Sequence, residues 1–252
     1  MTNIIINGCN GRMGQFITQM AEADEDFNVV AGIDARDDGH NSYPVFKDIN
    51  DCSVSADAVI DFSNPAALDA LMAYCTEHKL PCVVCTTGLS EEQVGKVKKA
   101  SEKIPVLRSS NMSVGINVLM KVLRQVAPVF AEAGFDIEIV EKHHNQKLDA
   151  PSGTAVSLAD CMNEALDEKY GYVYDRSSRR EKRPVNEIGI SSVRGGTIVG
   201  DHDVIFAGTD EVVTFSHRAY SRAIFAKGAL SAAAYISGKP AGMYDMGDVI
   251  SK

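Results

Sequence analysis

The sequence lacks the features of several protein classes. Its formal net charge is −9 over 252 residues, which argues against general binding to nucleic acid or to a membrane surface. No apolar run approaches the roughly 20 residues that span a bilayer. The first residues, MTNIIINGCN, have neither the basic start nor the small-residue cleavage site of a signal peptide. The six cysteines are scattered and do not form a disulfide framework, which favours a reducing, cytoplasmic location.

Two of these cysteines, Cys82 and Cys85, form a C-x-x-C pair. The spacing fits a redox pair or half of a metal site. The surrounding run LPCVVCTTG is instead typical of a buried parallel strand that ends in a turn. Residues three apart in a strand point to opposite faces, so the thiols should diverge. We therefore favour a core role for both.

The first part of the chain alternates short β-branched runs with helical patterns. Strands are expected at residues 3–7, 27–34, 56–63, 81–87 and 104–110, and helices at 11–23, 65–79 and 90–103. Pro65 follows Asn64 as a proline in the first helical position follows a cap. This alternation predicts an α/β fold with a doubly wound parallel sheet.

The pattern changes after residue 112. A long amphipathic helix is expected at 113–133, with Pro128 as a kink or stop. Further helices are expected at 152–168 and 221–237, and strands at 135–144, 188–194, 197–206 and 210–217. Consecutive strands predict a second α+β domain with an open mixed or largely antiparallel sheet. We expect residues 1–112 with 222–252 to form a dinucleotide-binding domain, and 113–221 a second domain. The basic loop from Arg176 to Arg183 could hold a phosphate or carboxylate, but we favour a solvated, mobile loop.

A glycine-rich turn follows the first strand, with Gly8, Gly11 and Gly14 at G-x-x-G-x-x-G spacing. Such turns bring backbone N–H groups around a diphosphate at a helix N-terminus. The spacing differs from G-x-G-x-x-G, and a plain turn is the alternative. Asp34 ends the second strand, where a carboxylate can bind the ribose hydroxyls, unless it is only a turn acid. It favours NADH over NADPH, although Arg36 could reduce the repulsion of a 2′-phosphate.

Residues 141–155, EKHHNQKLDAPSGTA, gather proton carriers and cations. His143, His144 and Lys147 can supply protons and positive charge, and the Ser152–Thr154 turn reads as a helix N-terminus after Pro151, where N–H groups and hydroxyls face an anion. The stretch predicts a site for a small dianion that must receive a proton. Taken singly, the histidine pair is more often surface or packing, and the turn more often just a cap. His202 and His217 lie at strand positions without metal partners at binding spacing and are interpreted as structural or surface residues.

Together these motifs resemble the 4-hydroxy-tetrahydrodipicolinate reductase (dihydrodipicolinate reductase) family of lysine biosynthesis. The resemblance covers essentially the whole chain in order, and rests on NGCNGRMG, CTTG, SSNMSVGINV, EKHHNQKLDAPSGTA, SVRGGTIVGDH and SRAIFAKGAL. It implies a Rossmann domain and a substrate domain whose open sheet makes homotetramer contacts. It also implies reduction of the dihydrodipicolinate synthase product to tetrahydrodipicolinate, with loss of water, by NADH or NADPH.

The resemblance also implies roles for individual residues. His143 matches the catalytic acid/base and Lys147 a second proton donor, while His144, Ser152, Gly153 and Thr154 fall at substrate contacts. The expected cofactor contacts are Gly8, Cys9, Asn10, Gly11, Arg12, Met13, Asp34, Cys85, Thr86, Thr87, Ser109, Ser110, Asn111 and Met112. Two positions depart from the family pattern. Cys85 replaces a glycine, which a glycine-only backbone conformation would not allow, and Ala35 stands where NADPH-using members can carry arginine.

Hydride addition to a cyclic imine leaves negative charge that an acid must quench. We expect Lys147 and the second imidazole to lower the pKa of His143 in the free enzyme, and a bound dianion to raise it again. Two alternatives stay open. One is a pyridine-nucleotide reductase of another small acid, and the other is a non-enzymatic NAD-sensing or metal-binding protein.

Overall fold

The computed structural model describes residues 1–251. The chain forms two compact units. The first comprises Met1–Val114 together with the segment from Arg222 onward, and the second comprises Gly115–Ser221. Each unit has its own sheet and is described separately.

The first unit is built on a parallel sheet. Its strands are β1 (Thr2–Asn7), β2 (Phe27–Ile33), β3 (Val45–Phe46), β4 (Ala58–Asp61), β5 (Cys82–Val84), β6 (Pro105–Arg108) and β12 (Gly242–Tyr244), in the order β12-β6-β5-β4-β1-β2-β3. All the pairings are parallel. The strand order reverses at β1, which lies between β2 and β4, and this is where doubly wound sheets bind ligands beyond their carboxyl ends.

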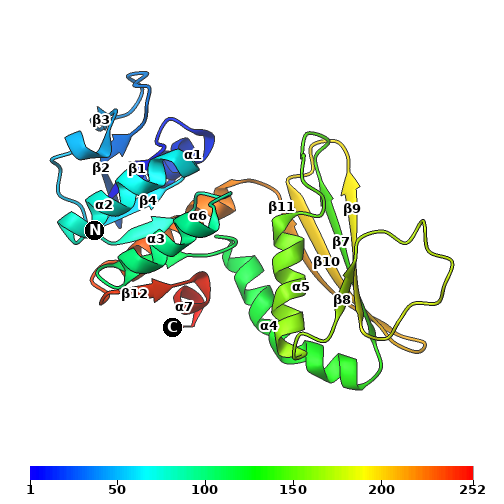
Figure 1. The fold of residues 1–252 in the computed structure, drawn as a ribbon. Coiled ribbons are helices and arrows are strands. Elements are labelled where there is room, and N and C mark those ends of the chain that lie inside the picture. The colour runs from blue at the N-terminus through cyan, green and yellow to red at the C-terminus, as the bar shows by residue number, and fades with distance from the viewer. Residues whose placement is uncertain (252) are drawn as a thin grey trace. The chain divides into compact units, whose positions relative to one another are not determined.

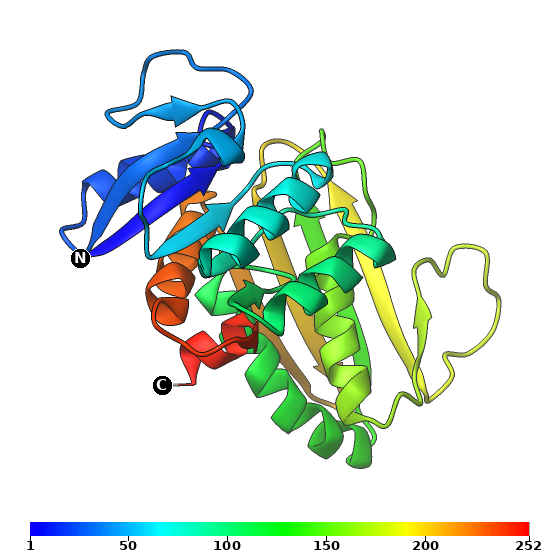
Figure 2. The ribbon, with the colours of Figure 1, turned by 60° about the vertical axis from the view of Figure 1, so that its left-hand side comes forward.

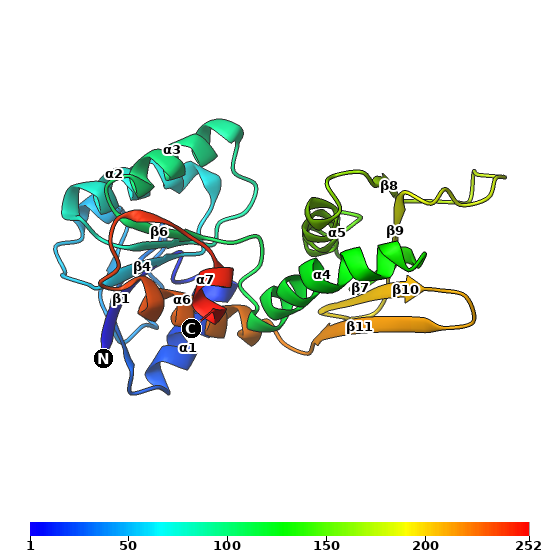
Figure 3. The ribbon, with the colours of Figure 1, turned by 90° about the horizontal axis from the view of Figure 1, so that it is seen from below.

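Helices cover both faces of this sheet, as Figure 3 shows. They are α1 (Arg12–Glu22), α2 (Leu68–His78), α3 (Glu91–Ser101), α6 (Ala223–Ile236) and α7 (Met246–Ile250), with short 3₁₀ turns η1 (Ile49–Asp51) and η2 (Pro65–Ala67). Alternation along β1 explains the two layers: Ile4 and Ile6 pack with α1 and α6, whereas Ile5 packs with α2 and α3. The predicted doubly wound α/β architecture is confirmed.

Local signals explain where the helices begin. Asn64 caps η2 through a hydrogen bond from the backbone N–H of Ala66, with Pro65 next in the chain, as predicted. Ser90 and Gln93 form a reciprocal capping box at the start of α3. These contacts satisfy backbone donors that the first turn of a helix leaves unpaired.

The second unit contains a mixed sheet. Its strands are β7 (Asp136–His143), β8 (Gly171–Val173), β9 (Glu187–Arg194), β10 (Gly200–Ala207) and β11 (Val212–Ala219), in the order β11-β10-β7-β9-β8. β10 runs antiparallel to β7 and β11, but β9 runs parallel to β7 and β8. The predicted mixed sheet is confirmed, and the largely antiparallel alternative holds only for β11, β10 and β7. The other pairings are parallel because the chain crosses over through a helix between β7 and β9. Helices α4 (Val114–Glu132) and α5 (Gly153–Ala165) cover one face (Figure 1).

Helix α4 continues past Pro128 to Glu132, so that proline does not stop it. By length and composition alone, with 19 residues and a mean hydropathy of 1.3, α4 could cross a membrane, which the sequence analysis did not anticipate. Its residues Ile116, Met120 and Leu123 recur at helical spacing and pack in the core of the second unit.

The structure decides two further interpretations. Cys82 and Cys85 belong to separate cores on opposite faces of the first sheet, and all six cysteines are free and buried. The loop between β8 and β9, prominent in Figure 2, is not simply solvated. Arg183 pairs with Asp136 at 2.7 Å and Glu138 at 3.0 Å. Arg176 and Arg179 pair with Glu187, so three of the loop's cations bind carboxylates of the chain itself.

Candidate active site

The glycine turn brings backbone segments together after β1. Gly8 has φ of +84°, and a Cβ there would lie 2.6 Å from the Phe62 carbonyl oxygen. A Cβ on Gly14 would lie 2.3 Å from the Gly8 oxygen. Gly11 is the N-cap of α1 and uses no side-chain cap. The helix N-terminus therefore stays bare, with the close backbone approach that a diphosphate needs.

Asp34 closes the other side of this turn. Its carboxylate accepts hydrogen bonds from the backbone N–H of Asn10 at 3.1 Å and of Arg36 at 3.2 Å. A pocket of about 340 Å³ lies between the turn and the end of β2, lined in part by Gly8, Asp34 and Lys47. A carboxylate beside a glycine turn and a pocket fits the ribose of a dinucleotide. Sequence reasoning missed Lys47, which follows β3 directly.

The other two predicted cofactor segments follow neighbouring strands of the same sheet. Cys85–Thr87 comes after β5 and Ser109–Met112 after β6, so both lie at the carboxyl edge with the glycine turn. Cys85 is not among the described residues with positive φ, so its backbone does not require glycine. A Cβ on Gly228 of α6 would lie 1.7 Å from the Met112 oxygen, which shows how closely this segment packs.

A buried carboxylate that the sequence analysis overlooked stands between these turns. Asp61, 1% exposed, accepts hydrogen bonds from Asn7 at 2.9 Å and from the hydroxyl of Ser63 at 2.5 Å. Burial raises the pKa of Asp61, and the hydrogen bonds only partly oppose it. The DFS sequence at the end of a β-strand was the available signal.

In the second unit, the predicted proton carrier His143 ends β7 against a buried carboxylate. Nδ1 of His143 lies 2.6 Å from Oε2 of Glu141, which is 0% exposed. Burial favours a higher pKa for Glu141, but hydrogen bonds from Arg194, Ser192 and His143 outweigh it and lower that pKa to about 2. Glu141 is therefore an anion that can only accept, so Nδ1 of His143 donates. Sequence analysis did not single out Glu141.

Arg194 completes the surroundings of this carboxylate. Its two terminal nitrogens donate to the two oxygens of Glu141 at 2.8 and 2.7 Å, and one also donates to the Asp149 carbonyl at 2.6 Å. The register of β7 and β9 places His143 opposite Arg194. Because the two strands are separated by a helix and a loop in sequence, no local pattern could have paired these residues.

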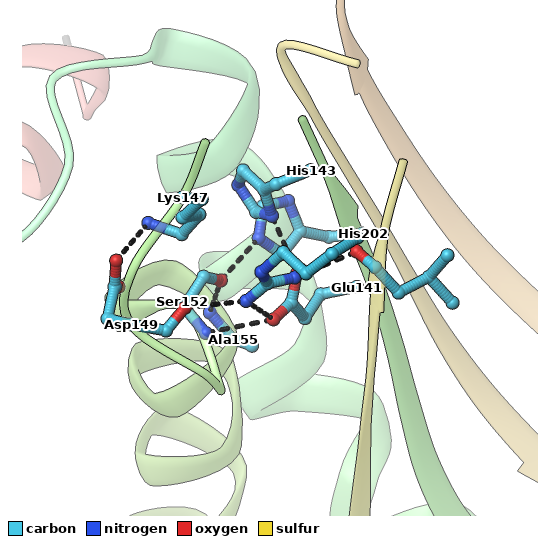
Figure 4. A network of polar contacts seen from close by, with 9 residues as sticks. Glu141, His143, Lys147, Asp149, Ser152, Ala155 and His202 are labelled. Atoms are coloured by element: carbon cyan, nitrogen blue, oxygen red, sulfur yellow. Dashed lines mark hydrogen bonds and ion pairs between the residues drawn. The ribbon is translucent and has the colours of Figure 1, made fainter. Parts of the chain in front are cut away.

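The start of α5 meets the same cluster, as Figure 4 shows. Ser152 caps α5 by accepting from the Ala155 N–H at 3.2 Å, and its own N–H donates to Glu141 at 3.1 Å. Its hydroxyl also shares a hydrogen bond of 3.0 Å with Nε2 of His202. Ser152 is 2% exposed and is thus engaged internally, which differs from the prediction that its hydroxyl faces the anion. Pro151 precedes the cap and does not open the helix.

His202 is buried inside this cluster and is not a surface residue. Its ring meets that of His143 edge-on, with centroids 5.2 Å apart. Burial, followed by the charge of His143, lowers the pKa of His202 to about 4, so the ring is neutral near pH 7. Its membership was hidden in sequence because only the register of β10 with β7, His202 opposite Glu141, brings it there.

The remaining predicted residues lie around this cluster. Lys147 forms an ion pair with Asp149 at 2.8 Å in the loop that leads to α5. Gly153 is the exposed first residue of α5, and Thr154 follows it half-buried. His144 is half-buried and follows the last residue of β7. Among the described residues, its side chain takes no part in the hydrogen bonds that join Glu141, His143, Ser152 and His202.

The ionisation of His143 follows from these neighbours. Burial lowers the pKa of His143 below its ordinary 6.5, Glu141 opposes that shift, and the charges of Lys147 and Arg194 add to it. Lys147 lowers the pKa of His143 as predicted, but burial is the larger cause. The second charge that lowers this pKa is Arg194, where the prediction named the second imidazole. The free imidazole is therefore poised to take up a proton when negative charge arrives.

Comparisons with known proteins cover both units. The family model described as the N-terminus of dihydrodipicolinate reductase matches residues 2–112, and that of its C-terminus matches residues 115–250. The chain is 50% identical to the 4-hydroxy-tetrahydrodipicolinate reductase of Clostridium tetani, over 98% of this chain and 96% of that protein. It is also 50% identical to that of Caldanaerobacter subterraneus, over 100% and 99%.

A solved structure agrees. The dipicolinate-bound dihydrodipicolinate reductase from Paenisporosarcina sp. TG-14 superposes with a TM-score of 0.79 at 26% identity, covering 97% of each chain. Both family models and two near-full-length relatives thus point the same way as the motifs. The chain belongs to the dihydrodipicolinate reductase family.

Proposed function

We propose that this protein is an NAD(P)H-dependent oxidoreductase that reduces 4-hydroxy-tetrahydrodipicolinate to tetrahydrodipicolinate, with loss of water, in the diaminopimelate and lysine pathway. The observation that carries the proposal is the buried Glu141–His143 pair at the start of the H-H-x-x-K-x-D-A-P-S-G-T-A stretch. The chain's 50% identity to reductases of that name supports the substrate.

The carboxyl edge of the first sheet is proposed to hold the nicotinamide cofactor. Gly8–Met13 would surround the diphosphate with backbone N–H groups, Asp34 would bind the ribose, and the segments 85–87 and 109–112 would hold the nicotinamide end. When bound, the cofactor supplies hydride. The fit rests on the steric limits at Gly8 and Gly14 and on the adjacent pocket.

His143 and Lys147 are proposed as proton donors, and His144, Gly153 and Thr154 as contacts of the substrate carboxylates. Nδ1 of His143 is engaged by Glu141, so Nε2 is the atom that would carry the transferred proton. Lys147 and the N-terminus of α5 add positive potential for a dianion. Ser152, placed by sequence among the substrate contacts, is proposed to act through the cap and through Glu141.

The direct test follows NADH oxidation with freshly made dihydrodipicolinate synthase product as substrate. Turnover that requires both the synthase product and the reductase is the expected result. A control with other small cyclic or linear dicarboxylates separates this activity from that of a reductase of a different acid. Oxidation of NADH with those acids and not with the synthase product would contradict the proposal.

We propose a modest preference for NADH over NADPH. Asp34 would repel a 2′-phosphate, and Ala35 offers no cation beside it, although Lys47 lines the same pocket. Calorimetry with ADP-ribose and its 2′-phosphate as probes should show tighter binding of the unphosphorylated compound. The substitution Asp34→Asn should narrow that difference and Lys47→Gln should widen it. Tighter binding of the phosphate by the wild type would contradict the preference.

We also propose that the protein is a cytoplasmic homotetramer. Both α4 and α5 pack on one face of the second sheet, and the described residues of the second unit, 115–221, contain no further helix to cover the other face. That face carries half-exposed residues such as Val140, Asp203 and Ile205. Six free, buried cysteines suit a reducing compartment. Sedimentation at micromolar concentration tests the assembly, and a monomer would contradict it.

A further inference from the structure

We propose that Glu141 and Arg194 are positioning residues for the reaction: Glu141 fixes the orientation of the His143 imidazole, and Arg194 holds Glu141 together with the loop that carries Lys147. The inference rests on the proposed function, in which His143 delivers the proton. Neither residue needs to touch the substrate. Their contacts are the observations that support it.

The Glu141 carboxylate is fully used by its neighbours. One oxygen accepts from Nδ1 of His143 at 2.6 Å and from Arg194 at 2.8 Å. The other accepts from Arg194 at 2.7 Å and from the Ser152 N–H at 3.1 Å. An ionised carboxylate only accepts, so neutral His143 must carry its hydrogen on Nδ1. The transferable proton then belongs to Nε2.

The surroundings of Nε2 fit this assignment. A Cβ on Gly200 of β10 would lie 3.0 Å from Nε2, so glycine at that position leaves the nitrogen uncovered by a side chain. The two ring nitrogens of His143 thus have different environments. One is buried on a carboxylate and the other lies beside the backbone of a glycine. This asymmetry is what a proton donor requires.

Arg194 joins the carboxylate to the loop that follows His143. One of the two Arg194 nitrogens that donate to Glu141, Nη2, also donates to the Asp149 carbonyl at 2.6 Å. The Asp149 carboxylate in turn pairs with Lys147 at 2.8 Å. A planar guanidinium can make these contacts at once, whereas a lysine ammonium has no such fixed fork. Loss of Arg194 would therefore loosen both the Glu141 carboxylate, which orients His143, and the loop that carries Lys147.

The charged and titratable groups around His143 come from four elements. Glu141 lies on β7, Arg194 on β9 and His202 on β10, while Lys147 and Asp149 lie on the loop before α5. Glu141 raises the pKa of His143, and Arg194 and Lys147 lower it. Removing Glu141 or Arg194 should therefore move the titration of His143 in opposite directions. A purely structural role predicts no such opposition.

The experiment uses the full-length enzyme and the variants Glu141→Gln and Arg194→Met. In the wild type, kcat/KM should fall as pH rises through the pKa of His143, because the protonated ring is the donor. Glu141→Gln should shift that limb to lower pH and reduce kcat at least about tenfold. Arg194→Met should shift it to higher pH and raise KM. The exposed pair Arg124–Glu164 of the same unit supplies the matched controls Glu164→Gln and Arg124→Met, which should leave the limb in place.

Each single variant leaves a buried group unpaired, so stability must be separated from catalysis. The double variant Glu141→Gln/Arg194→Met removes both charges and should recover much of the lost stability without recovering turnover. Arg194→Lys keeps the charge and should hold the pH limb near its wild-type position, while KM stays raised because lysine lacks the guanidinium fork. Nitrogen NMR of the imidazole should show the Nδ1–H tautomer of neutral His143 in the wild type and a mixture in Glu141→Gln.

Three results would overturn the inference. They are an Nε2–H tautomer in the wild type, an unshifted limb with kcat within about twofold of wild type in Glu141→Gln, and turnover restored together with stability in the double variant. If the wild type fails to reduce the synthase product, the proposed function fails. The tautomer measurement would still decide the positioning of His143.

Discussion

The carboxyl edge of the first sheet and the Glu141–His143 cluster of the second unit are built from different materials. The first relies on backbone: the glycines at 8 and 14 allow close approach, and successive strand ends add turns beside them. The second relies on side chains that converge from β7, β9, β10 and α5. A short motif can encode the first, whereas only the folded sheet assembles the second.

Two buried carboxylates make the same contrast in electrostatic terms. Asp61 and Glu141 are 1% and 0% exposed. Burial raises the pKa of Asp61, because its hydrogen bonds come from neutral groups. For Glu141, burial is outweighed by hydrogen bonds from Arg194 and others, and the pKa falls to about 2. Paired charge, and not depth of burial, determines which carboxylate stays ionised.

The largest effect on turnover is expected when the imidazole of His143 itself is removed. His143→Ala should lower kcat by about 10²- to 10⁴-fold, because the positioned acid is lost, while NADH binding, measured by calorimetry, should be unchanged. His78→Ala, in α2 of the first unit, is the control. Near-normal turnover of His143→Ala would show that the cluster of the second unit is not the proton source.

The pH dependence of stability should expose the buried His202. Its pKa is about 4 in the folded protein against 6.5 ordinarily, so the unfolded chain binds the proton first as pH falls. The contribution of neutral His202 to the free energy of unfolding is present above about pH 6.5. It is lost as pH falls toward about 4, by up to about 3 kcal/mol. The pKa values of His143 and His217 are also lowered, which adds to the same slope.

Denaturant unfolding at about pH 7.5 and about pH 5 measures this slope. His202→Asn should flatten it, and His40→Asn, at an exposed position, should not. An unchanged slope in His202→Asn would mean that the ring titrates alike in the folded and unfolded states.

Sequence patterns predicted the α/β architecture because hydrophobic periodicity and caps such as Asn64 are local. They missed β3, β8, β12 and α7, which are too short to show a period. At the candidate site they found His143 and Lys147 through a contiguous motif. They did not find Arg194 or His202, because strand register alone places those side chains beside Glu141.

A methyl group at Gly14 tests the backbone side of the comparison. In Gly14→Ala the Cβ would meet the Gly8 and Cys9 carbonyl oxygens at 2.3 and 2.5 Å, so the turn must move. We expect NADH binding to weaken by about 10- to 100-fold, the equivalent of an overpacking cost of about 1–3 kcal/mol. At Gly11 a Cβ would lie 3.2 Å from the Gly8 oxygen, so Gly11→Ala should perturb the turn less.

The control for Gly14→Ala is Gly95→Ala in α3, where a Cβ meets nothing within 4 Å. It should raise stability by about 0.5–1 kcal/mol without affecting binding. Equal NADH affinity in Gly14→Ala and wild type would show that the close approach of the backbone does not serve the cofactor.

The smallest expected effect concerns Cys85, which occupies a position where the family pattern has glycine. Its φ is not positive, and its side chain packs in the core that contains α1 and α6. Cys85→Gly and Cys85→Ala should therefore both bind NADH within about twofold of wild type, since the backbone contacts persist. The glycine variant should be less stable than the alanine variant by about 0.5–1 kcal/mol in denaturant unfolding, because glycine loses more backbone entropy on folding. Tighter NADH binding by Cys85→Gly alone would contradict this expectation. It would mean that the turn adopts, on binding, a backbone conformation that only glycine permits, so that the Cys85 side chain limits the affinity for NADH.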